Sequence, residues 1–248
     1  MKRTGTALLL LLALLLLASC ARAPKPERVS EEELAHLRLE FPCNDARSSL
    51  AMSMDPKKAY PTFEKLLGID NPYLEMPDFY AVVAIRMTED DWYTLGESVQ
   101  PFQDAALNEQ AQQRTPDLFQ IVWPVHDAVV EQVLWGGEDL EPGDTITLGF
   151  GADGYVGGMQ LERCYFADGR YVCFLLDRRD SSFHCDRLFS SSKNYTYYLS
   201  DQDVLASMTS TPGLDECSGM YLDAFAERVR GLLPDAEITD PTPGVETE

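Results

Sequence analysis

Between residues 79 and 199 the chain is a succession of short β-type segments separated by glycine and proline turns. Residues 79–87 (FYAVVAIRM) alternate apolar side chains on one face, which is typical of a strand. Residues 118–134 predict a long strand interrupted at Pro124. Proline donates no hydrogen bond to a sheet, so a bend, bulge or edge is expected there. Further strands are predicted at 145–150, 159–166, 170–177, 183–189 and 194–199. The core is therefore expected to be mainly β.

Helices are predicted on both sides of this region. Ser30 and Glu33 have the spacing of a capping box, which predicts a short helix beginning after Ser30. Pro61 is expected to begin a second short helix that Gly68 ends. A C-terminal helix ended by Pro234 is predicted from apolar residues at three- and four-residue steps. Those residues are Leu214, Cys217, Tyr221, Phe225, Val229 and Leu232.

The first 20 residues have the pattern of an export signal. Lys2 and Arg3 precede an apolar run over 7–18, which is too short for a membrane-spanning helix. Residues 17–20 (LASC) resemble the lipobox of bacterial lipoproteins, in which a cysteine follows the cleavage site. The alternative is a plain secretory signal that ends near a cysteine. We expect residues 1–19 to be a cleaved lipoprotein signal peptide.

The lipobox resemblance implies that Cys20 carries a thioether-linked diacylglycerol and becomes the mature N-terminus. Two or three acyl chains, palmitate among them, hold a protein stably on a membrane. No aspartate follows Cys20, since residue 21 is alanine. The predicted location is the extracytoplasmic side of the cell membrane: its outer leaflet in a Gram-positive cell, or the outer membrane in a Gram-negative cell. Residues 20–30 are expected to form the lipidated cysteine and a spacer.

The charge of the chain limits its partners. Removal of residues 1–19 takes away Lys2 and Arg3 and leaves 18 basic against 41 acidic residues, a net charge of −23. Nucleic-acid binding requires clustered Lys and Arg, so a nucleic-acid partner is excluded. We expect one globular β-rich domain over 31–233 and an acidic, disordered tail over 234–248.

A hairpin is predicted at Asp168-Gly169, which is a strong two-residue turn signal. Counting outward from this turn places Cys164 opposite Cys173, at a separation that a disulfide accepts. The other cysteines outside the signal segment are Cys43, Cys185 and Cys217. They leave open one further bridge with one free thiol, or a fully reduced set. A zinc site that includes His184 is the alternative.

No catalytic or metal-binding motif is recognisable. The three histidines are His36, His126 and His184, and none stands in a nucleophile-elbow or zinc-protease pattern. No cofactor is expected besides the covalent lipid on Cys20. Whether the protein is an enzyme stays open. A non-enzymatic role is preferred, with an envelope hydrolase using a thiol or carboxylate, or a purely structural lipoprotein, as alternatives.

Four segments over residues 79–178 carry a second resemblance: FYAVVAIRM, VVEQVLWGG, PGDTITLGF and LERCYFADGRYVCFLL. Their order resembles uncharacterised exported bacterial proteins and, more distantly, the netrin-like modules of tissue inhibitors of metalloproteinases. The resemblance implies a small OB-like β-barrel, or a strongly curved antiparallel sheet, flanked by short helices and a C-terminal helix. Those inhibitors chelate metal through a free N-terminal cysteine, which a lipidated Cys20 does not provide.

Such scaffolds bind ligands across one face or its loops. Trp92 and Tyr155 are the candidate binding residues, since exposed aromatic side chains anchor interfaces. The sequence thus predicts an extracytoplasmic lipoprotein that is attached to a membrane and binds a protein or cell-envelope ligand.

Overall fold

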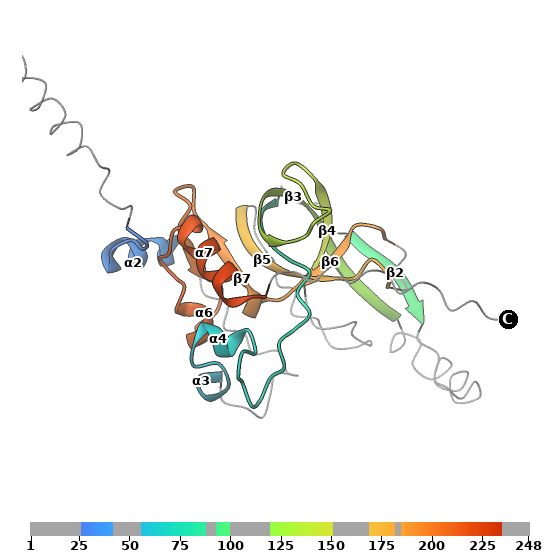
Figure 1. The fold of residues 1–248 in the computed structure, drawn as a ribbon. Coiled ribbons are helices and arrows are strands. Elements are labelled where there is room, and N and C mark those ends of the chain that lie inside the picture. Colours follow the sequence, from blue (N-terminus) through green and yellow to red (C-terminus); the bar gives the residue numbers. More distant parts are fainter. Residues whose placement is uncertain are drawn as a thin grey trace, which may run out of the picture.

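The computed structural model describes residues 26–41, 56–87, 93–99, 120–150, 169–181 and 185–234. These residues are mainly β, with a few short helices at one side of the sheet (Figure 1). The strands are β1 Ala81–Met87, β2 Tyr93–Val99, β3 Gln120–Gly136, β4 Thr145–Phe150, β5 Gly169–Asp177, β6 Leu188–Ser191, β7 Thr196–Leu199 and β8 Leu205–Ser207. The helices are α2 Glu31–Glu40, α3 Pro56–Ala59, α4 Phe63–Leu66, α6 Pro212–Asp215 and α7 Leu222–Leu232, and Lys193–Tyr195 form a 3-10 turn.

Five strands close into a barrel. Their order is β1-β3-β4-β6-β5, and β5 pairs with β1 to complete the circle. All pairs are antiparallel except β4 with β6, which are parallel. Strands β7 and β8 extend the sheet from β5, and β2 pairs with β3. The predicted small OB-like barrel with flanking helices is therefore confirmed.

Strand β1 confirms the strand predicted within residues 79–87, and it is buried on both faces. Ala81, Val83 and Ile85 face the barrel interior, while Val82 and Ala84 belong to a second core outside it. A strand covered on both sides has a nearly continuous apolar sequence, which the pattern FYAVVAIRM also fits.

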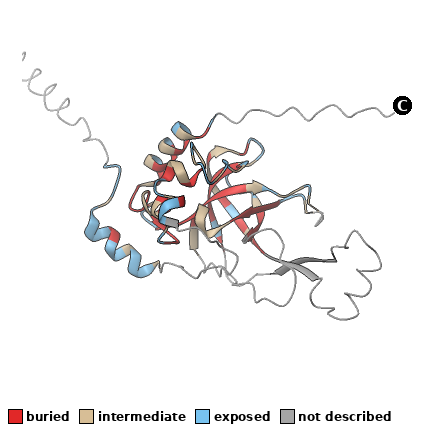
Figure 2. Ribbon diagram, turned by 90° about the horizontal axis from the view of Figure 1, so that it is seen from below, coloured by how far each residue is buried: buried red, intermediate tan, exposed pale blue. Residues whose placement is uncertain are grey.

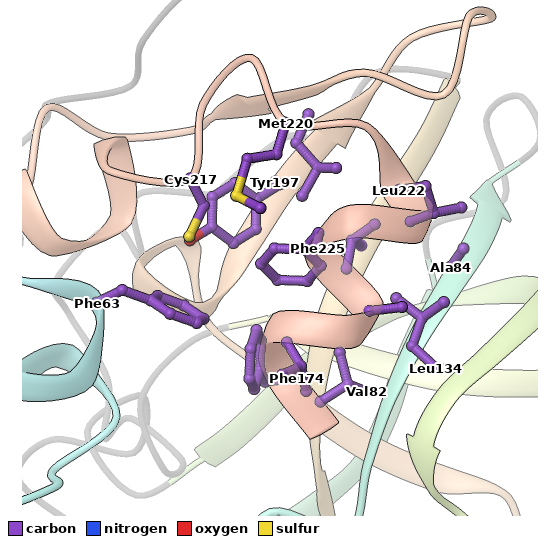
Figure 3. Packing of buried hydrophobic residues seen from close by; sticks show 14 of the residues in the cluster. Phe63, Val82, Ala84, Leu134, Phe174, Tyr197, Cys217, Met220, Leu222 and Phe225 are labelled. Atoms are coloured by element: carbon purple, nitrogen blue, oxygen red, sulfur yellow. The ribbon is translucent and has the colours of Figure 1, made fainter. Parts of the chain in front are cut away.

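The second core lies between the barrel and the short helices, and Figure 2 shows its burial. Phe225 of α7 is fully buried there against Phe63, Phe174 and Tyr197, with ring centroids 5.8, 6.3 and 5.2 Å away (Figure 3). Aromatic rings bury large areas and prefer such edge-on contacts. Helix α7 therefore holds the outer face of the barrel in place.

Capping and turn residues in the sequence predict the boundaries of several helices and strands correctly. The Ser30 capping box is formed, with the Glu33 backbone donating to the Ser30 hydroxyl and the Ser30 backbone to the Glu33 carboxylate. Helix α4 begins after Thr62, and Gly68 follows it with a positive φ of 86°. Strand β4 has the predicted bounds. Strand β3 is continuous through Pro124. Its ladder with β4 ends at Val125, so Pro124 has a partner only in β2 and lies at an edge, as one of the predicted alternatives has it.

Other boundaries differ from the predictions. The predicted C-terminal helix is two helices, α6 and α7, and Cys217 and Tyr221 lie between them. Strand β6 begins at Leu188, five residues later than expected, and β8 was not predicted. The predicted strand 159–166 lies outside the described residues, as does all of the acidic tail except Pro234.

Candidate functional site

Four of the five predicted site residues lie outside the part of the chain that the structure describes. They are Cys20, Trp92, Tyr155 and Cys164. Cys173 is described, and it is a buried, free thiol in the middle of β5.

The Cys164–Cys173 disulfide stays a prediction, because Cys164 lies outside the described residues. Strand β5 has neighbours on both sides at this point, with Val83 of β1 and Thr196 of β7 opposite Cys173. No third strand can join the ladder there, because a strand has two edges. Described residues therefore occupy both ladder positions beside Cys173.

Burial governs the chemistry of the two interior thiols. It raises the pKa of Cys173 to about 12, although Thr196 and Ser191 hydrogen-bond to the sulfur. It likewise raises the pKa of Cys217, which lies beside Tyr197 beneath α7, to about 11 (Figure 3). A thiolate is the nucleophilic form, so neither residue is suited to nucleophilic attack at neutral pH. Cys185 is free and half-buried.

The described histidines do not form a catalytic set with these thiols. His36 is exposed on α2, and His184 lies outside the described residues. His126 is buried in β3, and its Nδ1 contacts the backbone carbonyl of Asp127. The Asp127 carboxylate instead accepts a hydrogen bond from Thr147 at 3.0 Å. Within the described ranges, no three His, Cys, Asp or Glu side chains gather as metal ligands.

A polar cluster among the described residues surrounds Arg179, just after β5. Its guanidinium lies 2.5 Å from Asp177 and also pairs with Asp139 in the β3–β4 turn. It stacks over the ring of Tyr80, 4.7 Å from the centroid, and lies 5.2 Å from that of Phe189. We call these five residues the Arg179 cluster.

Hydrogen bonds within the Arg179 cluster set its charge states. Burial by itself would raise the pKa of both carboxyls, but hydrogen bonds outweigh it and lower the pKa of Asp139 and of Asp177. Arg179 donates to both carboxylates, and the Tyr80 hydroxyl donates to Asp139. Burial and the bond to Asp139 raise the pKa of the Tyr80 phenol. The cluster therefore carries two carboxylates and one guanidinium at neutral pH.

The Arg179 cluster fixes two loops at one end of the barrel. Asp139 belongs to the β3–β4 turn, Arg179 to the segment after β5, and Tyr80 precedes β1. Charge-assisted bonds from one guanidinium to two carboxylates hold these segments in a defined geometry. Sequence reasoning missed this cluster, because Asp139 and Arg179 are 40 positions apart and follow no periodic pattern.

A second ion-pair cluster lies at the opposite end of β1. Glu131 binds Arg86 at 2.7 Å and Arg170 at 2.6 Å. Arg170 also contacts Asp203 at 2.9 Å. Ion pairs therefore lie at both ends of the barrel. Buried apolar side chains fill the interior between these ion pairs.

Comparison with family models, curated proteins and solved structures found no match to this chain. The fold defines its class: a mainly β protein built on a closed, mixed five-stranded barrel with helices over one face. No helix among the described residues has the length and apolar character needed to cross a membrane.

Proposed function

We propose that this protein is an extracytoplasmic lipoprotein, attached to a membrane through Cys20, whose barrel binds a protein or cell-envelope ligand without chemistry. The attachment is supported by the sequence alone: basic residues, a short apolar run and LASC at residues 17–20. Each acyl methylene buried in a bilayer contributes about 0.8 kcal/mol, so multiple chains anchor the protein stably.

The observation that supports ligand binding best is the Arg179 cluster. Recognition requires surface loops that are held in one conformation before the ligand arrives, since ordering them on binding costs affinity. Here one guanidinium fixes two loops at the end of a rigid barrel. Binding residues are commonly found on loops that a rigid scaffold positions in this way.

The predicted aromatic anchors give a direct test of binding. The mature protein, immobilised through its C-terminal tail, is incubated with a detergent extract of cell envelopes, and the retained material is quantified. Trp92→Ala with Tyr155→Ala should reduce retention at least about tenfold, because aromatic anchors dominate interface energies. Tyr73→Ala is the matched control, since Tyr73 is an aromatic residue that is 60% exposed elsewhere. Equal retention by the double variant and the control would refute the binding proposal.

The envelope hydrolase remains the alternative, and the burial of two thiols reduces the number of cysteines that could be its nucleophile. Cys173 and Cys217 are buried with raised pKa values, which disfavours both as nucleophiles. A thiol hydrolase would therefore have to use another cysteine. The structural lipoprotein is the third possibility, and it predicts retention of cell-wall material with no saturation by soluble extract.

A further inference from the structure

The chain enters the folded domain very soon after the proposed anchor. The Tyr221 backbone donates to the Glu27 carbonyl at 3.0 Å, and Val29 donates to the Gly219 carbonyl at 2.9 Å. Arg28 and Met220 form an isolated β-bridge between these bonds. Only residues 21–26 separate Cys20 from this attachment. A chain spans at most about 3.5 Å per residue, so the attachment lies within about 25 Å of the lipidated cysteine.

Helix α2 does not lengthen this tether, because it is fixed to the same end of the domain. Leu34 is buried, and its side chain lies against the backbone of Gly219. Arg38 pairs with Asp215 at 2.5 Å. Phe41, just after the helix, stacks on Tyr198 with ring centroids 4.9 Å apart. The segment is thus held from Glu27 to Phe41.

The attachment and the Arg179 cluster lie at opposite ends of the barrel. The Gly219 backbone donates a hydrogen bond to the Leu205 carbonyl in β8. Leu205 lies opposite Leu199 of β7, and Leu199 lies opposite Arg170 of β5. Arg170 in turn lies opposite Arg86, near the end of β1. The Arg179 cluster contacts Tyr80, just before the start of β1. Residues Ala81 and Arg86 are five positions apart in the strand, which is about 17 Å.

We infer that the end formed by α2 and the Gly219 turn faces the bilayer, and that the Arg179 cluster faces away from it. This inference depends on the proposed lipid attachment at Cys20. A tether of six residues keeps the attachment point close to the membrane, so the domain has little freedom to turn over. The fixed loops at the Arg179 end then point outward, where a ligand in the envelope can reach them.

The charges of α2 keep the domain from lying flat on the lipid. Glu31 and Glu32 are exposed in its first turn. Anionic headgroups repel such carboxylates within a Debye length of about 8 Å at physiological salt. The tethered end is therefore near the bilayer without inserting into it.

Energy transfer to the membrane tests this orientation. The lipidated mature protein is reconstituted in vesicles of phosphatidylcholine and anionic phosphatidylglycerol that contain headgroup-labelled acceptor lipid. A genetically encoded fluorescent residue replaces either Leu39, which is 81% exposed on α2, or Glu138, which is exposed beside Asp139. Transfer should be at least about twofold stronger from position 39, given a strand-length separation of about 17 Å. Equal transfer, or stronger transfer from position 138, would overturn the orientation.

Two controls separate the possible failures. Vesicle flotation is measured first: a protein that does not float with the vesicles refutes the lipid attachment and the orientation together. A protein that floats but shows equal transfer refutes the orientation alone. Inserting about 20 Gly and Ser residues after Ala23 makes the tether flexible and long, so the difference between the two positions should shrink. A difference that survives this insertion would refute the short tether as its cause.

Discussion

The helix-covered side of the barrel and the Arg179 end each contain an arginine that pairs with two carboxylates beside an aromatic ring. At the helix-covered side, Arg228 pairs with Glu64 at 3.0 Å and with Glu216, and it lies 5.1 Å from the Phe63 ring centroid. At the other end, Arg179 pairs with Asp139 and Asp177 over the ring of Tyr80. The two arginine side chains are 22% and 27% exposed, so they hardly differ in their own burial.

The difference lies in what each arginine connects. Arg228 joins α7 to α4 and to the segment after α6, and these elements cover the aromatic core beneath them. Arg179 joins loops at the end of the barrel, where only Tyr80, Leu140 and neighbouring residues pack against the edge of the barrel core. The helix-covered side is therefore expected to determine stability, while the Arg179 end determines loop geometry and binding.

Removing the central ring of the helix-covered core should have the largest effect. Phe225→Ala deletes a fully buried side chain that contacts three other rings. We expect the free energy of unfolding in urea to fall by about 3–5 kcal/mol. Leu39→Ala, on the exposed face of α2, should change it by less than about 0.5 kcal/mol. A loss below about 1 kcal/mol for Phe225→Ala would contradict the role assigned to this core.

The buried thiols report whether reagents can reach the two cores, since Cys217 lies in the helix-covered core and Cys173 in the barrel interior. Cys173 and Cys217 should alkylate with iodoacetamide at pH 8 at least about 100-fold more slowly in the native protein than in denaturant. Burial raises the pKa of both thiols, and the reagent reaches them only when the structure opens. Peptide mass spectrometry over a time course gives each rate. Rapid native labelling of either cysteine would instead favour the thiol hydrolase.

A glycine substitution tests the geometry of the β3–β4 turn next to the Arg179 cluster. Gly136 has a φ of 62°, and an added Cβ would lie 2.4 Å from the Tyr80 carbonyl oxygen. Gly136→Ala should therefore destabilise the protein by about 2–3 kcal/mol. Gly143→Ala is a matched control in the same turn, since its φ is 99° but nothing lies within 4 Å. Gly143→Ala should lower the free energy of unfolding by about 1 kcal/mol. Equal losses of stability in the two variants would show that the contact with Tyr80 is unimportant.

The Arg179 cluster should have the smallest effect on stability, and that effect should depend on pH. Hydrogen bonds lower the pKa of Asp139 and of Asp177 in the folded state. Their stabilisation is therefore present above the ordinary aspartate pKa of about 3.9, and it is lost as pH falls through the lower folded values. Arg179→Met should destabilise the protein slightly at pH 7, and the difference from wild type should shrink toward pH 3. Urea melts at several pH values measure this, and a difference that is constant with pH would contradict it.

Local signals in the sequence predicted the local structure well. The Ser30 capping box and the bounds of β4 follow from hydrogen-bonding residues and alternation within a few positions. The predicted C-terminal helix was too long, because Cys217 and Tyr221 keep helical apolar spacing while the chain between α6 and α7 forms a turn and a bridge.

Features that depend on contacts between distant parts of the chain could not be predicted from the sequence. Whether β1 is covered on one face or both depends on α7, more than 130 residues later in the chain. Nothing in the sequence pattern predicted that β1 and β7 pair with β5 on either side of Cys173. Arg179 resembles any surface arginine until the fold brings Asp139 beside it.

The intact mass of the protein extracted from cell membranes tests the central claim most directly. The account predicts a chain that begins at Cys20 and carries the added mass of a diacylglyceryl group, with or without an N-acyl chain. Cys20→Ala should abolish both the lipid and the cleavage. A membrane-bound chain that retains residues 1–19, or that begins near residue 20 without lipid, would contradict the account.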